Sequence, residues 1–414
     1  MSLTVTHLNS DASFLLSFHP LPAFPTTPGQ PAKPFNVVLD PWLSGSAKIF
    51  HSSFSIARHK FGASVASLTD LPDLDLVVVS QAKSDHCHKE TLTQLPPRGG
   101  QTRILAEPGA AKIIRGWKHF APEQVITLPR FEEPRPGKPA AVYRLPIAST
   151  ALHARPGEIT ITFLAQKADL TRLHSAVGIT YRAPGDLPDP APTPPATPTS
   201  SRLPSHRGER ALSVIHAPHG IAWKALEPYA ATHLQPQGAL PVTALLHCFD
   251  RIQNAWYLGG NICSGLPGGI EVAQRLQAQV WISAHDGEKE IQGLANRNLV
   301  VQKFARADVE KEVSPRADPF SRSRRTEAVV LGVGEEMRLE PRPVSGSGSD
   351  ADADARLHVD APPTRSRAGG LRPSRTRHPD ASSDADAGPG PRRGNSSSSL
   401  LVSHACTSRA VMII

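Results

Sequence analysis

The stretch LVVVSQAKSDHCHKETL, residues 76–92, joins an apolar run to a polar turn and then to a helix pattern. The run, read with the residues before it as LDLVVVS, predicts a strand that is buried on both faces. The turn carries Asp85 and His86 side by side, at the point where the strand ends. Loops at strand ends often form sites, because a rigid scaffold holds them. We therefore take this turn as the first candidate site.

Strand and helix patterns alternate through the first three quarters of the chain. Helices are predicted at PGAAKIIRG and GGIEVAQRLQ, and β-type runs include FNVVL, EITITFLA, ALSVIHA and QVWIS. Such alternation favours a layered α/β domain, which we predict over residues 1–310.

Two segments have a composition that does not support a packed core. Residues 184–210 are rich in Pro, Ser and Thr, and residues 311–414 are mostly Ser, Arg, Asp, Gly and Pro. Neither can bury enough apolar area to offset the entropy of ordering its chain. We predict a disordered insert at 184–210 and a disordered, low-complexity C-terminal tail at 311–414.

The charge balance argues against a nucleic-acid partner. The formal net charge is +8, but much of the basic excess is scattered Arg in the low-complexity segments, without interleaved aromatic residues. No run of ~18 apolar residues is present, so no membrane association is expected. The N-terminus also lacks a signal-peptide pattern.

The four cysteines form no CxxC pair and no disulfide-framework spacing. Reduced thiols are typical of the cytoplasm, which is the location that we predict.

Histidines and carboxylates recur at the ends of the predicted strands. They are Asp40 in VVLDPW, Asp85 and His86, His219 in HAPHG, and His285 in WISAHDG. Imidazole and carboxylate are ligands for divalent ions such as zinc. If the loops meet at one edge of the sheet, these residues can form a metal site.

The order of the landmarks LDPWLSG, VVVSQAKSDHCHKETL, RILAEPGAAKIIR, HAPHG, YLGG and WISAHDGEKE resembles the metallo-β-lactamase superfamily. The resemblance is strongest to its branch of UlaG-like and fungal hydrolase-like proteins, and it covers residues 1 to about 300. It implies a four-layer αββα sandwich with a metal site along one edge.

The family motif HxHxDH, which holds two metals, is degenerate in this chain. Gln81 and Lys83 stand at the positions of the first two histidines, whereas Asp85 and His86 match. Gln offers a weak neutral oxygen and the Lys ammonium has no acceptor. Two cations ~4 Å apart also repel by several kcal/mol at an effective dielectric of ~20. The first metal position is therefore expected to be empty.

The second metal position keeps its ligands according to this resemblance. Asp85 and His86 are joined by His285, which aligns with the final family histidine, and His219 is a possible fourth ligand. His174 is a candidate for the middle histidine of the family. The expectation is one divalent ion, zinc first with Mn or Fe as alternatives, or no metal at all.

Lys83 allows three interpretations. As a catalytic residue beside Asp85, it could stabilise a developing oxyanion, or act as a neutral amine that accepts a proton. It could also be an ordinary solvated lysine. Asp85 and Ser84 have an alternative role too, because either could cap the helix that follows. Asp40 could only shape the turn before Pro41, and His216 is expected to be structural.

Two functions remain open. The first is a metal-dependent hydrolase that acts on a small-molecule ester, amide, lactone or phosphoester. The second is a catalytically inactive binding or scaffold protein of the same fold, for which the loss of the two motif histidines argues. In that case the tail and the insert would suit capture of a protein partner.

Overall fold

The computed structural model describes residues 1–20, 33–49, 51–97, 100–148, 154–186, 210–314 and 325–342. All of them belong to one compact unit of the chain. Most of the predicted insert, residues 187–209, and the tail from residue 343 lie outside the described residues, so their predicted disorder stays a prediction.

Two seven-stranded sheets dominate the described part of the chain. In spatial order, the first contains β22 (Glu336–Leu339), β1 (Ser2–His7), β2 (Phe14–His19), β3 (Phe35–Leu39), β6 (Leu76–Val79), β7 (Arg103–Ala106) and β8 (Val125–Thr127). Its strands β3, β6, β7 and β8 are parallel to one another. Their carboxyl ends therefore lie along one edge, as the prediction of a strand-end site requires.

The second sheet is built in a similar way. Its spatial order is β21 (Glu327–Val329), β18 (Val280–Ser283), β15 (Ala244–His247), β14 (Leu212–Ala217), β12 (Ser175–Arg182), β11 (Gly157–Ala165) and β9 (Tyr143–Ile147). Strands β14, β15 and β18 are parallel, so the loops after them also begin at a common edge.

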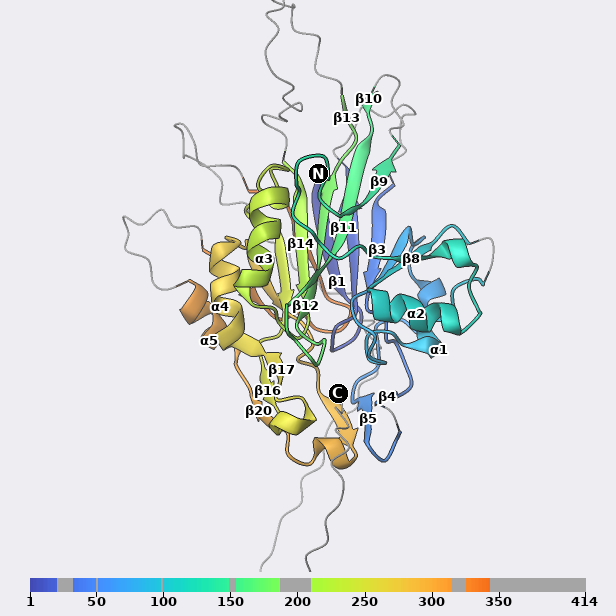
Figure 1. Ribbon diagram of the computed structural model, residues 1–414, viewed down its shortest axis with the longest axis vertical. Helices are drawn as coiled ribbons and strands as arrows, with labels where there is room; N and C mark the ends of the chain where they lie inside the picture. The colour runs from blue at the N-terminus through green and yellow to red at the C-terminus, as the bar shows by residue number, and fades with distance from the viewer. Residues whose placement is uncertain are drawn as a thin grey trace, which may run out of the picture. The chain divides into compact units, whose positions relative to one another are not determined.

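Helices cover the outer faces of the two sheets. Figure 1 shows α1 (Lys89–Leu92) and α2 (Pro108–Gly116) on one side, and α3 (Trp223–Tyr229), α4 (Gly265–Arg275) and α5 (Arg306–Val313) on the other. One buried apolar cluster joins the inner faces of both sheets, and two others lie beneath the helices. The predicted four-layer αββα sandwich is confirmed.

Strand β6 explains why the apolar run LVVV is continuous. Leu76 and Val78 belong to the cluster between the sheets, whereas Val77 and Val79 belong to the cluster beneath α1 and α2. All four side chains have zero exposure. Full burial of each stabilises the fold by about 1.5–3 kcal/mol relative to an exposed side chain, and it fixes the start of the Asp85–His86 turn.

The sheets extend past the predicted domain boundary at residue 310. Strand β21 pairs with β18, and β22 pairs with β1, so residues 327–339 contribute to both sheets. The boundary was placed too early because these strands are only three and four residues long, and Ser- and Arg-rich sequence flanks them. Backbone pairing with strands already in place stabilises segments too short to give a clear sequence pattern.

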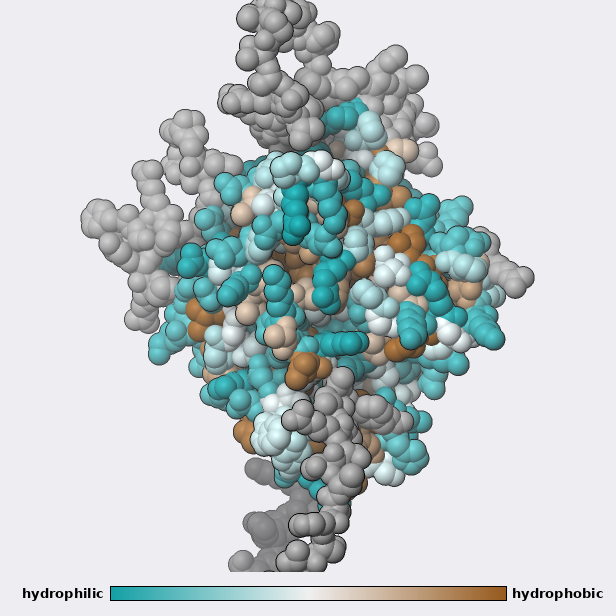
Figure 2. All heavy atoms as spheres, viewed as in Figure 1, coloured by the Kyte–Doolittle hydropathy of each residue, from teal (hydrophilic) through white to brown (hydrophobic). Residues whose placement is uncertain are grey.

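Three smaller sheets complete the described strands. They are β10 (Ala154–Arg155) with β13 (Gly185–Asp186); β17 (Asn261–Ser264), β16 (Arg251–Gln253) and β20 (Val300–Gln302); and β19 (Lys289–Gln292), β5 (Ser55–His59) and β4 (Ala47–Ile49). On the face seen in Figure 2, hydrophilic residues cover most of the surface and hydrophobic ones form separate patches. No helix in the described ranges is long and apolar enough to cross a membrane.

Candidate metal centre

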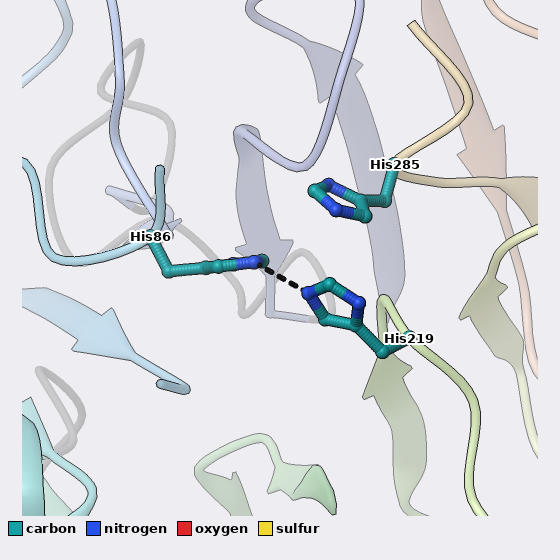
Figure 3. A group of neighbouring side chains, drawn as sticks. All are labelled: His86, His219 and His285. Carbon is teal, nitrogen blue, oxygen red and sulfur yellow. Dashed lines mark hydrogen bonds between the residues drawn. The ribbon is translucent and has the colours of Figure 1, made fainter. Parts of the chain in front are cut away.

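Three histidines from three separate loops converge at one edge of the sandwich. His86 follows β6, His219 follows β14, and His285 follows β18. One ligand nitrogen of each lies within 4.8 Å of the others, and all three residues are buried. Figure 3 shows the three rings turned toward one another. The dashed line joins the Nε2 atoms of His86 and His219, which are hydrogen-bonded at 3.1 Å. The parallel strands thus bring together residues that are far apart in the sequence.

The Asp40 carboxylate fixes the orientation of His86. His86 Nδ1 donates to Asp40 Oδ2 at 2.8 Å, and His216 Nε2 donates to the same oxygen at 2.8 Å. Ser80 donates its backbone NH to Oδ1 and its hydroxyl to Oδ2, at 2.7 and 2.6 Å. Asp40 is completely buried, so its role is not limited to shaping the turn before Pro41. Because Nδ1 of His86 is occupied, Nε2 is left facing the other histidines.

Asp11 orients His285 in the same manner. Asp11 lies in the loop between β1 and β2, and its Oδ2 accepts from His285 Nδ1 at 3.0 Å. The Lys289 ammonium lies 2.8 Å from the same oxygen. Close approach of the two loops requires glycine at position 287, where a Cβ would lie 2.0 Å from Ser10 O.

His219 is held by the segment around β17. Its Nδ1 donates to Ile262 O at 3.1 Å and lies 3.4 Å from Cys263 Sγ. Each of the three imidazoles is therefore bound through Nδ1 to a group outside the cluster. Carboxylates and carbonyls that bind the distal nitrogen of a histidine commonly orient metal ligands.

Asp85 borders the histidine cluster on its more open side. Its Oδ2 lies 3.9 Å from His86 Nε2 and 4.0 Å from His285 Nε2. Its Oδ1 is buried without a hydrogen-bond partner among the described residues. The side chain is 22% exposed, more than the three histidines. Asp85 therefore has a free carboxylate oxygen available beside the cluster.

The charges around the cluster favour a divalent cation. Asp11, Asp40 and Asp85 contribute three negative charges, and the Lys289 ammonium offsets one. These four side chains together carry a net charge of −2, which is the charge that a divalent ion would balance. Such a surplus is unfavourable in a buried region unless a cation or protons compensate for it.

The pKa values of His86 and His219 are shifted in opposite directions. Burial alone would lower the pKa of His86, but Asp85 and Asp40 raise it above its usual value. Burial, and then His285 and His86, lower the pKa of His219 well below its usual value. His219 is therefore neutral, with the Nε2 lone pair available to a metal.

Asp85 and Asp40 are ionised in this environment. Burial would raise the pKa of each carboxyl, but neighbouring histidines lower both below the usual value, with His86 the strongest of them. Both carboxylates can therefore accept hydrogen bonds or attract a cation at neutral pH.

Gln81 and Lys83, predicted to stand at the positions of the first two motif histidines, differ in their contacts. Gln81 Nε2 donates to Leu173 O at 2.9 Å, tying the turn to the loop after β11. Lys83 borders a cavity of about 440 Å³ and makes no ion pair with the described residues. Burial lowers the pKa of Lys83, and the attraction of Asp85 opposes that shift.

His174, the candidate for the family's middle histidine, lies outside the cluster of three. Its Nε2 donates to Asn261 O at 3.1 Å. Neither Asp85 nor Ser84 caps the helix after the turn. His88 is the N-cap of α1 and accepts from Thr91 N. Ser84 instead donates to Lys48 O, so the capping interpretation of the Asp85–His86 turn is wrong.

The sequence did not identify Asp11 or Lys289 as part of this site. The region LNSDAS resembled part of a strand pattern, although its turn-forming residues Asn9, Ser10 and Asp11 are a hairpin signal. Lys289 lies four residues after His285 in the same landmark. Its charge beside a predicted ligand was the available signal.

Known proteins match this chain in structure rather than in sequence. No family model matches the sequence, and no curated protein matches it. Igni18, a metallo-hydrolase from Ignicoccus hospitalis, is 12% identical with a TM-score of 0.43, over 83% of this chain and 100% of Igni18. An isothiocyanate hydrolase from Delia radicum gut bacteria is 15% identical with a TM-score of 0.42, over 81% of this chain and 98% of that chain.

A third solved structure, from Thermotoga maritima, is assigned as a Zn-dependent hydrolase of the metallo-β-lactamase superfamily. It is 11% identical with a TM-score of 0.28, over 79% of this chain and 97% of that chain. Each of these three matches has an identity of 15% or less and a TM-score below 0.5.

Proposed function

We propose that this protein is a metal-dependent hydrolase that binds one divalent ion through His86, His219 and His285. The observation that carries the proposal is the convergence of three imidazoles whose Nδ1 atoms are all engaged elsewhere. With each Nδ1 bound to an acceptor outside the cluster, the three Nε2 atoms are left for a metal ion, which would take the place of the proton between His86 and His219.

Zinc fits this donor set well. It is commonly bound by histidine nitrogens at 2.0–2.1 Å in tetrahedral geometry, for which two ligand nitrogens lie about 3.3 Å apart. The separation of 3.1 Å between the Nε2 atoms of His86 and His219 is close to that value. Three histidines leave one position open, as in catalytic zinc sites. We therefore propose zinc, with manganese and iron as alternatives.

The bound ion would activate a water molecule and polarise a carbonyl group. Asp85 is ionised and one of its oxygens has no hydrogen-bond partner among the described residues, so it would serve as a general base beside the cluster. Asp40 and Asp11 would keep His86 and His285 in the tautomer that leaves Nε2 free. Lys83, whose pKa the attraction of Asp85 raises against the effect of burial, would supply a positive charge near Asp85.

A reducing compartment is also proposed, on the basis of the thiols. Cys87, Cys248 and Cys263 are free and buried in the described part of the chain. Free thiols persist in the cytoplasm, which supports a cytoplasmic location.

Activity assays on purified protein test the function. Protein stripped of metal and then reloaded with zinc should hydrolyse an aryl ester or lactone, whereas the stripped protein should not. Asp85→Asn should lower kcat by about 100-fold or more, because an amide cannot accept the proton, while zinc content is retained.

Two outcomes would contradict the proposal. One is hydrolysis by the protein stripped of metal; the other is the absence of hydrolysis of esters, lactones and amides by the zinc-loaded protein. The latter result would favour the inactive binding protein.

Restoring the two missing motif histidines tests the roles of Gln81 and Lys83. The double variant Gln81→His, Lys83→His should bind about two ions per chain instead of about one, because it replaces a cation and a weak oxygen with two nitrogen ligands. Elemental analysis measures the gain. A single-residue control, Lys83→Gln, removes the charge without adding a ligand and should keep one ion. An unchanged count in the double variant would mean that these positions do not face the first metal position.

A further inference from the structure

A cleft of about 650 Å³ is lined in part by residues that adjoin His219 in the sequence or by a backbone hydrogen bond. It is bounded by the loop after β11, the start of α3, and the segment from Trp256 to the first turn of α4. Its volume is in the range of ~300–1,000 Å³ that small-molecule sites occupy. His86, His219 and His285 do not line the cleft, whereas His174 does. The class of ligand that fits the cleft is therefore inferred from its lining residues.

One wall of the cleft continues directly from the metal centre. Ile221 and Ala222, which line it, follow His219 by two and three residues. Ser264, also in the wall, donates its backbone NH to His219 O at 3.0 Å. A molecule held in the cleft would therefore lie against the segment that carries one proposed metal ligand.

A second wall is the loop at residues 166–174. Gln81 donates to Leu173 O, and His174 Nε2 donates to Asn261 O, so this loop is tied to the turn after β6 and to the start of β17. Asp169 caps the turns of this loop by accepting from the backbone NH groups of Thr171 and His174. The residue that replaces a metal ligand thus fixes a wall of the cleft.

The lining is apolar and acidic. Leu170, Trp223 and Trp256 provide large apolar surfaces, and Trp256 is 87% exposed and Leu170 75% exposed. Asp169 and Glu271 are the charged residues among those that line the cleft, and no lysine or arginine lines it within the described residues. Exposed aromatic rings bind apolar ligands well, whereas two carboxylates repel an anion.

We propose that this cleft binds the apolar, aromatic part of a neutral or cationic ester or lactone, and that it excludes phosphoesters. The inference rests on the proposed function, because it assigns the substrate class of the same site. Of the four substrate types considered for the metal centre, namely esters, amides, lactones and phosphoesters, the proposal favours esters and lactones and excludes phosphoesters. A phosphoester carries negative charge toward Asp169 and Glu271, and the lining offers no guanidinium or ammonium group to balance it.

Ligand binding to metal-free full-length protein tests the cleft independently of catalysis. Calorimetry should show that 2-naphthol binds, and that 2-naphthyl phosphate binds at least about 10-fold more weakly. Trp256→Ala should weaken binding of 2-naphthol by about 10-fold, which corresponds to about 1.4 kcal/mol. Trp117→Ala, a tryptophan that borders a different cavity, is the matched control and should leave binding unchanged. Glu271→Gln should narrow the difference between the two ligands.

Kinetics of zinc-loaded protein then separate the two ideas. With 2-naphthyl acetate, Trp256→Ala should raise KM by about 10-fold and leave kcat nearly unchanged, because the ring binds substrate away from the reacting atoms. Equal binding of 2-naphthol and its phosphate, or no effect of Trp256→Ala on either binding or KM, would overturn the cleft assignment. Binding of 2-naphthol without any zinc-dependent hydrolysis would instead support the cleft and refute the proposed function.

Discussion

Replacement of His285 by alanine is expected to abolish metal binding. Protein purified without chelator should contain about one zinc, manganese or iron per chain, and the His285→Ala variant should contain almost none. Only His86 and His219 would remain of the three imidazoles, and Asp11 and Lys289 would lose the ring that they orient. Elemental analysis of both proteins gives the result directly.

Two controls separate loss of a ligand from loss of structure. His285 has a φ of 69°, in the left-handed region, where histidine is found more often than alanine, so the substitution adds backbone strain. Gln277→Ala also places alanine at a left-handed position, with a φ of 50°, but on the exposed surface. This control protein should keep its metal. His219→Ala removes a ligand where the backbone is unstrained and should also lose the metal. Metal retained in both histidine variants would rule out the histidine site.

Replacement of Asp40 by asparagine is expected to reduce both stability and metal affinity. Four donors point at this carboxylate: the NH and hydroxyl of Ser80, His86 Nδ1 and His216 Nε2. An amide must turn its own NH₂ toward at least one of them, whichever way it is rotated. We expect the free energy of unfolding to fall by about 3–5 kcal/mol, as for other broken buried pairs. Zinc affinity should fall roughly 10- to 100-fold, because His86 loses its orienting partner.

Denaturant unfolding and competition with a zinc chelator measure the two effects. Asp75→Asn is a matched control, because Asp75 accepts one backbone NH, from Asn36, and an amide oxygen can replace that acceptor. It should change stability by much less and leave zinc affinity unchanged. If Asp40→Asn behaves like the control, Asp40 does not position His86. Asparagine also tolerates the φ of 41° at this position, so backbone strain does not confound the comparison.

The sequence could predict the parts of this fold that depend on local pattern. The continuous apolar run LVVV predicted strand β6 correctly, because both faces of the strand are buried. Pro108 likewise predicted the start of α2. His86, His219 and His285 could be selected because each follows an apolar run, and parallel strands bring such ends together. The family resemblance supplied the layer order.

The partners of these histidines could not be read in the same way. Asp11 and His285 are 274 residues apart, and Asp40 and His216 are 176 apart. A period of two along a strand tells which face a side chain occupies, but not which residue of another sheet lies opposite. His216 was expected to be structural. It donates to Asp40, which in turn accepts from His86, so this buried strand histidine helps to hold the carboxylate that orients a proposed metal ligand.

Strands β21 and β22 have a consequence for the behaviour of shortened chains. They cover the backbone of β18 and β1, which would otherwise present unpaired NH and CO groups along two long sheets. Each is short and carries charged residues, namely Glu327 on β21 and Glu336 and Arg338 on β22, which discourages pairing with a further strand. A protein that ended at residue 310 would retain the metal-centre residues but expose both inner strands to other copies, so it would be prone to aggregation.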